Sequence, residues 1–180
     1  MATSVTATVT SDCSYSFLDT NTNSNLNETS SLGHSMALSA GTGTGEINAA
    51  VRITGSLPAG GETIFSFNSL AKELFGSSST VNFSNVKAVL IKNGWNGPGD
   101  AGISDLNEVA NMHVRATGAN GFSGLFNGQS GNLKVSPNST FSFIEKFGEA
   151  VSLTQHEVSL VDTDGSGVSY MLIAVGVSGI

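Results

Sequence analysis

Apolar and polar residues alternate strictly at the start of the chain, and this pattern predicts a long strand. The even positions between residues 6 and 16 are all polar. Apolar residues occupy the odd positions Val5, Ala7, Val9, Cys13, Tyr15 and Phe17, and only Ser11 breaks this row. A period of two places every second side chain on the same face of a strand. Residues 1–18 are therefore expected to form one long strand, or two strands on one line, that belongs to the fold or docks onto a neighbour as an arm.

A polar stretch and then a series of shorter alternating segments follow. Residues 19–33 are rich in Asn, Ser and Thr and predict a polar loop. Beyond them, alternation recurs in short segments separated by turns that contain Gly or Pro, which predicts about ten short strands. The phase of the alternation changes near Asn85, from odd positions at Phe83 to even positions from Val86 onward. That change indicates a β-bulge or a bend between two strands.

One short helix is predicted at residues 69–75. Leu70 and Leu74 lie four residues apart, which places both on one helical face. Asn68 or Ser69 can cap the N-terminus, and the glycine after residue 75 can end the helix. We expect this helix to close one end of a single all-β domain over 1–180, a jelly-roll-like antiparallel sandwich.

Composition and charge support the all-β prediction and narrow the function. Charged residues make up 12% of the chain, against about 25% in typical domains, and polar turn residues take their place. The net charge is −7, from 14 acidic and 7 basic residues, and no basic run is present. Because contacts from Lys and Arg to phosphate dominate binding to nucleic acids and to anionic membranes, neither is an expected partner.

The N-terminal segment also bears on cysteine chemistry and on targeting. Cys13 is the only cysteine, so it cannot form an intrachain disulfide, and its place in the apolar row favours a buried thiol. The first residues contain neither a basic segment nor an apolar segment of the kind found in secretory signal peptides, so no signal peptide is expected.

One loop carries part of a calcium-binding pattern. Asp162, Asp164 and Ser166 supply oxygen atoms at the first, third and fifth positions, and a glycine follows at the sixth. The pattern then stops, because Ile173 occupies the twelfth position, where a bidentate glutamate belongs. A hairpin turn between two strands accounts for the same residues. These three residues are a calcium candidate only, and the sequence otherwise indicates no metal or cofactor.

The sequence contains no arrangement that favours catalysis. Serines are abundant, but none lies in the Gly-x-Ser-x-Gly turn of a hydrolase elbow. His34, His113 and His156 fit surface or capping positions. We therefore expect a protein that binds or assembles and is not an enzyme, with no catalytic residues.

Three residues are candidates for contact with a partner. Trp95 is the only tryptophan and lies in the Gly-rich segment 94–105. Its ring can stack on a sugar, anchor a protein contact or plug one end of the core. Val5 and Val9 belong to the N-terminal alternating segment, whose apolar row can pair with a neighbouring molecule.

Several stretches resemble small β-sandwich proteins of tailed-bacteriophage virions. They are AAVRITG at 49–55, LPAGGETIF at 57–65, NSLAKELFG at 68–76, VNFSNVKAVLIKN at 81–93 and GVSYMLIAVG at 167–176. Their order is similar to a strand, a short helix, a V-x-F-x-x-V-K-x-x-L-I-x-N strand and a final Y-x-x-x-x-x-G strand. The resemblance covers roughly residues 47–180 and leaves the N-terminal segment outside.

The resemblance implies a role on the virus particle. It implies a capsid decoration or cement protein that binds the major capsid protein on the outside of the head, is made in the host cytoplasm and carries no catalytic residues. A homo-oligomer is expected, and a trimer would match a three-fold axis of a capsid. The alternative is a carbohydrate- or receptor-binding module of a tail fibre, because one fold can serve either role.

Overall fold

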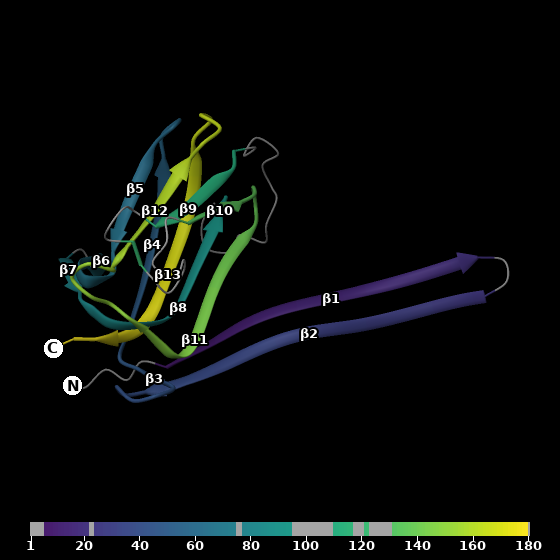
Figure 1. Cartoon of the computed structure of the whole chain (residues 1–180), viewed down its shortest axis with the longest axis horizontal. Helices are drawn as coiled ribbons and strands as arrows, with labels where there is room; N and C mark the ends of the chain where they lie inside the picture. The colour runs from purple at the N-terminus through teal and green to yellow at the C-terminus, as the bar shows by residue number, and fades with distance from the viewer. Residues whose placement is uncertain are drawn as a thin grey trace.

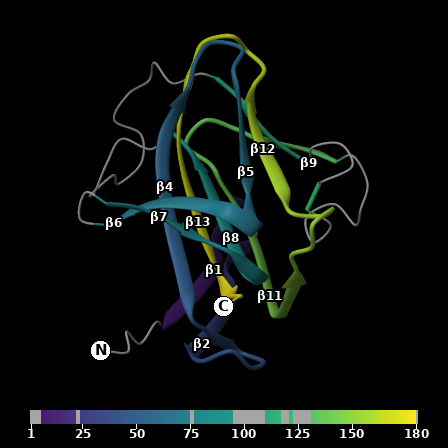
Figure 2. The same cartoon turned by 90° about the vertical axis from the view of Figure 1, so that its left-hand side faces the viewer.

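The computed structural model describes residues 6–21, 24–74, 77–94, 110–116, 121–122 and 131–179. The body contains the strands β4 (Ala49–Leu57), β5 (Glu62–Ser66), β8 (Phe83–Asn93), β9 (Met112–Ala116), β10 (Asn132–Val135), β11 (Thr140–Ala150), β12 (Glu157–Asp162) and β13 (Val168–Ser178). These strands form two four-stranded antiparallel sheets (Figures 1 and 2). Sheet I has the order β11-β8-β13-β4, and sheet II has the order β10-β9-β12-β5.

The order of strands in the two sheets is that of a jelly roll. In chain order, the first, third, sixth and eighth of these strands form sheet I, and the other four form sheet II. Every connection except that from β9 to β10 therefore crosses from one sheet to the other. Two Greek keys wound together produce this order. The predicted jelly-roll-like sandwich is confirmed.

Large apolar side chains fill the space between the sheets. Fully buried members from both sheets include Ile91, Leu172, Val114 and Leu160. Phe122 packs edge-to-face on Phe67 at a ring-centroid distance of 5.0 Å and on Phe143 at 6.2 Å. Edge-to-face contact brings the positive edge of one ring to the negative face of the next, which adds to the gain from burial. The core thus accounts for the apolar rows of the sequence.

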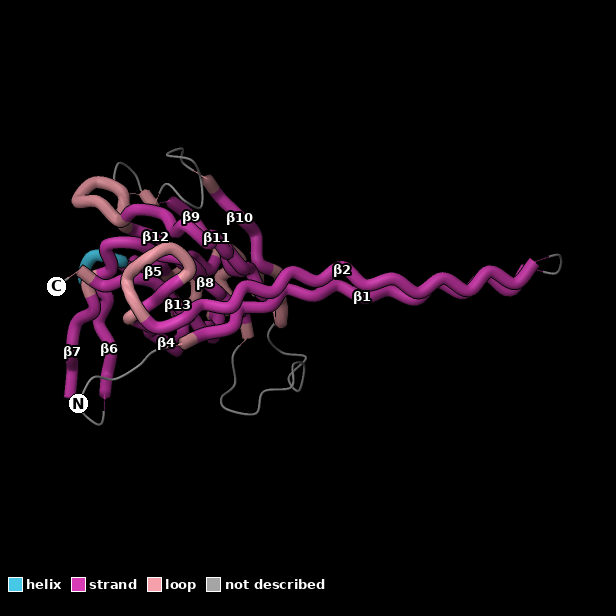
Figure 3. Tube along the Cα trace, turned by 90° about the horizontal axis from the view of Figure 1, so that it is seen from below, coloured by secondary structure: helices cyan, strands magenta, loops and turns pink. Residues whose placement is uncertain are grey.

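A long hairpin leaves the base of the sandwich and extends well beyond it (Figures 1 and 3). It consists of β1 (Ala7–Asn21) and β2 (Ser24–Ala40), which pair antiparallel without a break in register. The 15 residues of β1 span about 50 Å at about 3.3 Å per residue. We call this hairpin the arm. The short β3 (Glu46–Ile47) pairs in parallel with the end of β2 and leads into the body.

The segment 19–33, predicted as a polar loop, instead lies largely in the two strands of the arm. Asp19 pairs with Leu26, and the ladder continues through Gly33 opposite Asp12. The hydrogen bonds of a ladder come from the backbone, so a polar sequence can form a ribbon. The sequence of this segment did not predict a strand, because it is polar throughout most of its length and lacks the alternation of apolar and polar residues that marks one.

The helix predicted at 69–75 is also wrong. A single 3-10 turn at Phe67–Ser69 precedes β6 (Leu70–Leu74), which pairs antiparallel with β7 (Ser77–Val81) across the side of the sandwich (Figure 2). A spacing of four residues suits a helix, but it is also a multiple of the strand period of two. Pairing with β7 decides between the two structures.

The phase change near Asn85 is a β-bulge in β8. Against β13, the paired residues jump from Ala88 to Val86, which leaves Lys87 without a partner in the ladder. A Cβ atom on Gly176, opposite Val86, would collide with the backbone of Asn85, so the two strands approach this closely only at a glycine. Four consecutive residues at the bulge, Val86–Val89, are buried, and one of them is the lysine.

Candidate assembly interface

The base of the arm packs against the outer face of sheet I. Val9, Met36 and Leu38 are 5%, 7% and 2% exposed, and they form a cluster with Ala88 and Val175. Val89 and Ala174, which follow Ala88 and precede Val175, belong to the core between the sheets, so alternation directs Ala88 and Val175 outward. This second apolar cluster joins the arm to the sandwich.

Val9 thus lies in a contact within its own chain. It was a candidate for partner contact, and its place in the cluster accounts for its apolar side chain. Val5 and Trp95, the other two candidates, lie outside the described residues.

A buried lysine ties the body to the loop that follows the arm. The Lys87 side chain is 2% exposed, and its Nζ donates to the carbonyl oxygen of Gly43 at 2.6 Å. The N–H of Gly43 in turn donates to Oε2 of Glu46 at 2.8 Å. Burial lowers the pKa of Lys87, and the nearby Glu46 carboxylate partly offsets this effect. The lysine therefore acts as a clamp on loop 41–45, where β2 turns into β3.

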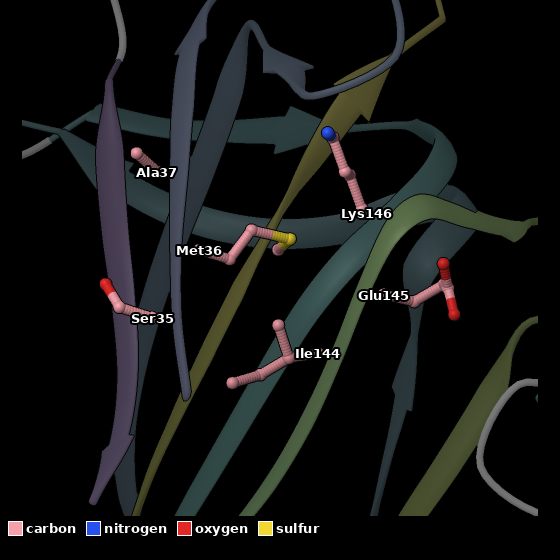
Figure 4. Close-up of a pocket in the computed structure, with 6 residues that line it drawn as sticks. All are labelled: Ser35, Met36, Ala37, Ile144, Glu145 and Lys146. Carbon is pink, nitrogen blue, oxygen red and sulfur yellow. The ribbon is translucent and has the colours of Figure 1, made fainter. Parts of the chain in front are cut away.

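A groove of about 440 Å³ separates the arm base from the edge of sheet I (Figure 4). Its walls are Ser35, Met36 and Ala37 from β2 and Ile144, Glu145 and Lys146 from β11. Figure 4 shows Met36 reaching from β2 toward β11 near Ile144, while Glu145 points away from β2. The groove therefore has an apolar floor and a charged rim on its β11 side.

Both walls of the groove are strand edges that lack a partner strand among the described residues. β11 is the outermost strand of sheet I, and β3 pairs with β2 only at Ser39 and Ala40. Within the described chain, the edge of β2 away from β1 is therefore unpaired from Ser24 to Leu38. Unpaired edges present rows of N–H and C=O groups that another strand can use. The arm and groove can accept a strand by β-addition.

The calcium candidate is a loop whose N–H groups converge on a carboxylate. Oδ1 of Asp162 accepts from the N–H groups of Asp164 at 3.0 Å and Gly165 at 3.2 Å, while Oδ2 accepts from Gly60 at 3.0 Å and Gly167 at 2.9 Å. Burial alone would raise the pKa of Asp162, but these four donors outweigh burial and lower it.

The second carboxylate of the loop, that of Asp164, also accepts N–H groups. Asp164 accepts from the backbone N–H of Asn111 at 2.8 Å and from its side chain, and these bonds lower the pKa of Asp164. Ser166 is exposed. Calcium requires six to eight oxygen ligands, whereas these carboxylates already face N–H donors. No group of three or more His, Cys, Asp or Glu residues in the described ranges could hold a metal ion.

The hairpin turn proposed for these residues is also corrected. The loop leads from β12 in sheet II to β13 in sheet I, so it is an arch between sheets. An arch does not receive the ladder hydrogen bonds of a hairpin. The Asp162 carboxylate supplies acceptors for its backbone N–H groups in their place.

The sequence interpretation missed two residues that define the interface. Lys87 lies inside the most apolar run, Val86–Ile91, and a lysine in a buried strand is a signal that it has a specific partner. Met36 belonged to an alternating segment, but nothing in the sequence indicated that it would face β11. Its neighbour across the groove, Ile144, is far away along the chain.

Comparisons with known proteins add little to this picture. No protein-family model matches the sequence, and no curated protein is significantly similar to it. The crystal structure of the Yersinia pseudotuberculosis-derived mitogen is similar over 71% of this chain and 86% of that one, at 13% identity and a TM-score of 0.35. That degree of similarity supports no argument about function. In the described ranges, no helix has the length and apolarity needed to span a membrane.

Proposed function

We propose that this chain is a viral structural protein that decorates the outside of a phage head and stabilises it, with the arm as its attachment element. The observation that carries the proposal is the arm, whose strand β1 is about 50 Å long and whose distal part extends beyond a small sandwich. Among the described residues, its outer strand edges are unpaired except where β3 joins β2 at Ser39 and Ala40. The resemblance over residues 47–180 supports the same role.

Attachment by strand addition explains how such a protein would strengthen a shell. A strand edge of a capsid subunit would pair with the arm or enter the groove beside β11, which provides backbone hydrogen bonds on both sides. A protein that binds the assembled shell in preference to free subunits stabilises the shell by mass action. The major capsid protein is the partner that this mechanism requires.

A shortened arm provides the test. Deleting residues 12–33 and joining Ser11 to His34 through Asn-Gly keeps the base cluster intact. Ser11 pairs with His34, and this pair lies an even number of positions from the closing pair of Asn21 and Ser24. The new turn therefore has the same hydrogen-bonding phase as the original one.

Undecorated heads of the phage that encodes this chain are mixed with either protein and sedimented. The intact chain is expected to co-sediment at a fixed ratio to the major capsid protein and to raise the temperature at which heads lose DNA. The shortened variant, checked for folding by its thermal unfolding, is expected to stay in the supernatant. Equal co-sedimentation of both proteins, or of neither, would contradict the proposal.

One observation favours the alternative of a carbohydrate- or receptor-binding module. Phe147 is 73% exposed and borders a groove of about 330 Å³ that also contains Thr42, Thr44 and Asn85. An exposed ring beside hydroxyl and amide groups can stack on a sugar. Retention of the intact chain on a glycan array, lost in Phe147→Ala, would support this function in place of decoration.

A further inference from the structure

We propose that the distal part of the arm, residues 11–34, docks on the outer face of sheet I in a second copy of this chain. The inference rests on the proposed role of the arm in assembly but does not depend on a phage head. It assigns the arm a partner whose surface is known, because that surface is part of this structure.

The arm base already shows which surface suits the apolar row of the arm. Within one chain, Val9 and Met36 face each other in the register and pack on the outer face of sheet I. In the sequence, steps of two from Val9 lead through Ser11 to Cys13, Tyr15 and Phe17, and steps of two back from Met36 lead through His34 to Leu32, which pairs with Cys13. After one polar pair, the apolar row therefore resumes in the part of the arm that extends beyond the sandwich (Figure 3).

A ribbon of this kind needs a partner for its apolar row. An isolated two-stranded hairpin is marginally stable in water, and stability comes from packing on a third element. The arm points away from its own sandwich, so it cannot lie across its own sheet I beyond the base (Figure 1). The same face of another copy offers an equivalent surface.

The receiving face combines apolar and basic residues. Alternation in the strands of sheet I directs Leu90, Met171 and Ile173 outward, and all three are half-buried. Ile173 pairs with Leu90 on one side and with the exposed Arg52 on the other, and Met171 pairs with Lys92. Leu90 and Ile173 already pack in part on the arm-base cluster of their own chain. The surface that remains for a second copy is therefore their exposed remainder together with Met171 and the exposed Arg52.

The charge of the arm complements the basic residues of that face. Residues 11–34 contain Asp12, Asp19 and Glu28 and neither lysine nor arginine. By alternation, Asp19 and Glu28 belong to the face of the apolar row, whereas Asp12 belongs to the opposite face. Opposite charges at the edge of an apolar contact favour one orientation and speed association. Because each copy has one arm and one receiving face, reciprocal docking closes an oligomer of cyclic symmetry.

The solution mass of the full chain tests the proposal directly. By light scattering after gel filtration, the intact chain is expected to have at least twice the monomer mass of 18.4 kDa. The shortened-arm variant is expected to elute as a monomer with an unchanged thermal unfolding transition of the sandwich. A monomeric intact chain, or a shortened variant that remains oligomeric, would overturn the proposal.

Charge reversal tests the contact itself. Arg52→Glu is expected to weaken association by about tenfold, which corresponds to about 1.4 kcal/mol. Replacing Asp19 and Glu28 by lysine is expected to weaken it similarly, and combining these replacements with Arg52→Glu is expected to restore it. Lys134→Glu, on sheet II, is the matched control and is expected to have no effect. Independent effects of the two changes, without restoration, would contradict docking on this face.

The two proposals fail in different ways. A monomer that still co-sediments with heads would overturn the second-copy inference and leave the decoration function in place. An arm-dependent oligomer that ignores heads would support the second-copy inference and contradict decoration.

Discussion

Replacing Asp162 by asparagine would measure how strongly one carboxylate holds the arch between the two sheets. The carboxylate accepts four backbone N–H groups, two on each oxygen. An amide keeps one acceptor oxygen, so two of the four donors would face its NH₂ group. At about 1.5 kcal/mol for each hydrogen bond to a charged group, Asp162→Asn should cost about 3 kcal/mol of unfolding free energy. For a chain of this size, that is a fall in Tm of about 6–12 °C.

The pH dependence of this Tm difference shows whether Asp162→Asn acts through loss of the negative charge or through loss of packing. The pKa of Asp162 in the folded protein lies below its ordinary value of 3.8. Its stabilising contribution is therefore fully present above about pH 5 and is lost as the pH falls through the folded pKa. The difference in Tm between Asp162→Asn and the unmodified chain should be constant near neutral pH and should shrink below about pH 4.

A matched variant and a metal titration complete the experiment. Glu62→Gln makes the same chemical change at an exposed position at the same end of the molecule, and its Tm should change by less than about 2 °C. Millimolar Ca²⁺ should leave the Tm of the unmodified chain unchanged. Calorimetry at several pH values measures both effects. Equal losses in the two variants, or a rise in Tm with calcium, would refute the assignment of this carboxylate to the backbone of the arch.

Three further substitutions probe the arm base and the bulge. Met36→Asp places a charge in the cluster under the arm and should speed proteolytic cleavage of the arm, whereas Ala37→Asp, at the exposed next position, should not. Lys87→Met should change the unfolding free energy by less than about 1 kcal/mol, because it removes both a buried charge and its hydrogen bond, yet amide exchange in loop 41–45 should accelerate. Gly148→Ala should cost about 2 kcal/mol by chemical denaturation, because φ is +77° and the new Cβ would collide with side chains of β8. Gly165→Ala, at φ +73° in open space, should cost about half as much, and equal costs would show that the collision does not matter.

The sequence was informative wherever one side of a strand is buried. The odd-position apolar row of residues 5–17 predicted a strand, and in β4 the alternation of Val51 and Ile53 with Arg52 and Thr54 follows the burial pattern. The shift of phase near Asn85 was enough to locate the bulge, because an extra residue reverses which positions are buried. In these segments, apolar residues in the sequence mark the positions that are buried in the structure.

Prediction from the sequence failed where strands pair without an alternation of buried and exposed side chains that the sequence would reveal. Residues 24–33 pair along the arm through their backbone, and their polar sequence resembles that of a loop. Leu70 and Leu74 fit two periods equally well. The groove depends on Met36 and Ile144, which are distant in the sequence and come together because the arm base packs on sheet I. Contacts of this kind depend on how the sheets and the arm are arranged in space, and the local periodicity of the sequence does not predict that arrangement.

The strand order also has a consequence for folding during synthesis. β12 and β13 are the last two strands of the sandwich to be made, yet each lies inside its sheet, β12 between β9 and β5 and β13 between β8 and β4. Neither sheet can close before these strands leave the ribosome, and pairing of segments so distant in the chain is slow. The arm is made before the sandwich and can close as a local hairpin within microseconds, but without the sandwich such a hairpin is only marginally stable. For most of translation, a nascent chain would therefore display strands with unpaired edges and no folded body, the condition in which β-rich chains aggregate. Slower growth at lower temperature, or more abundant chaperones, should raise the yield of folded protein more for the intact chain than for the shortened-arm variant.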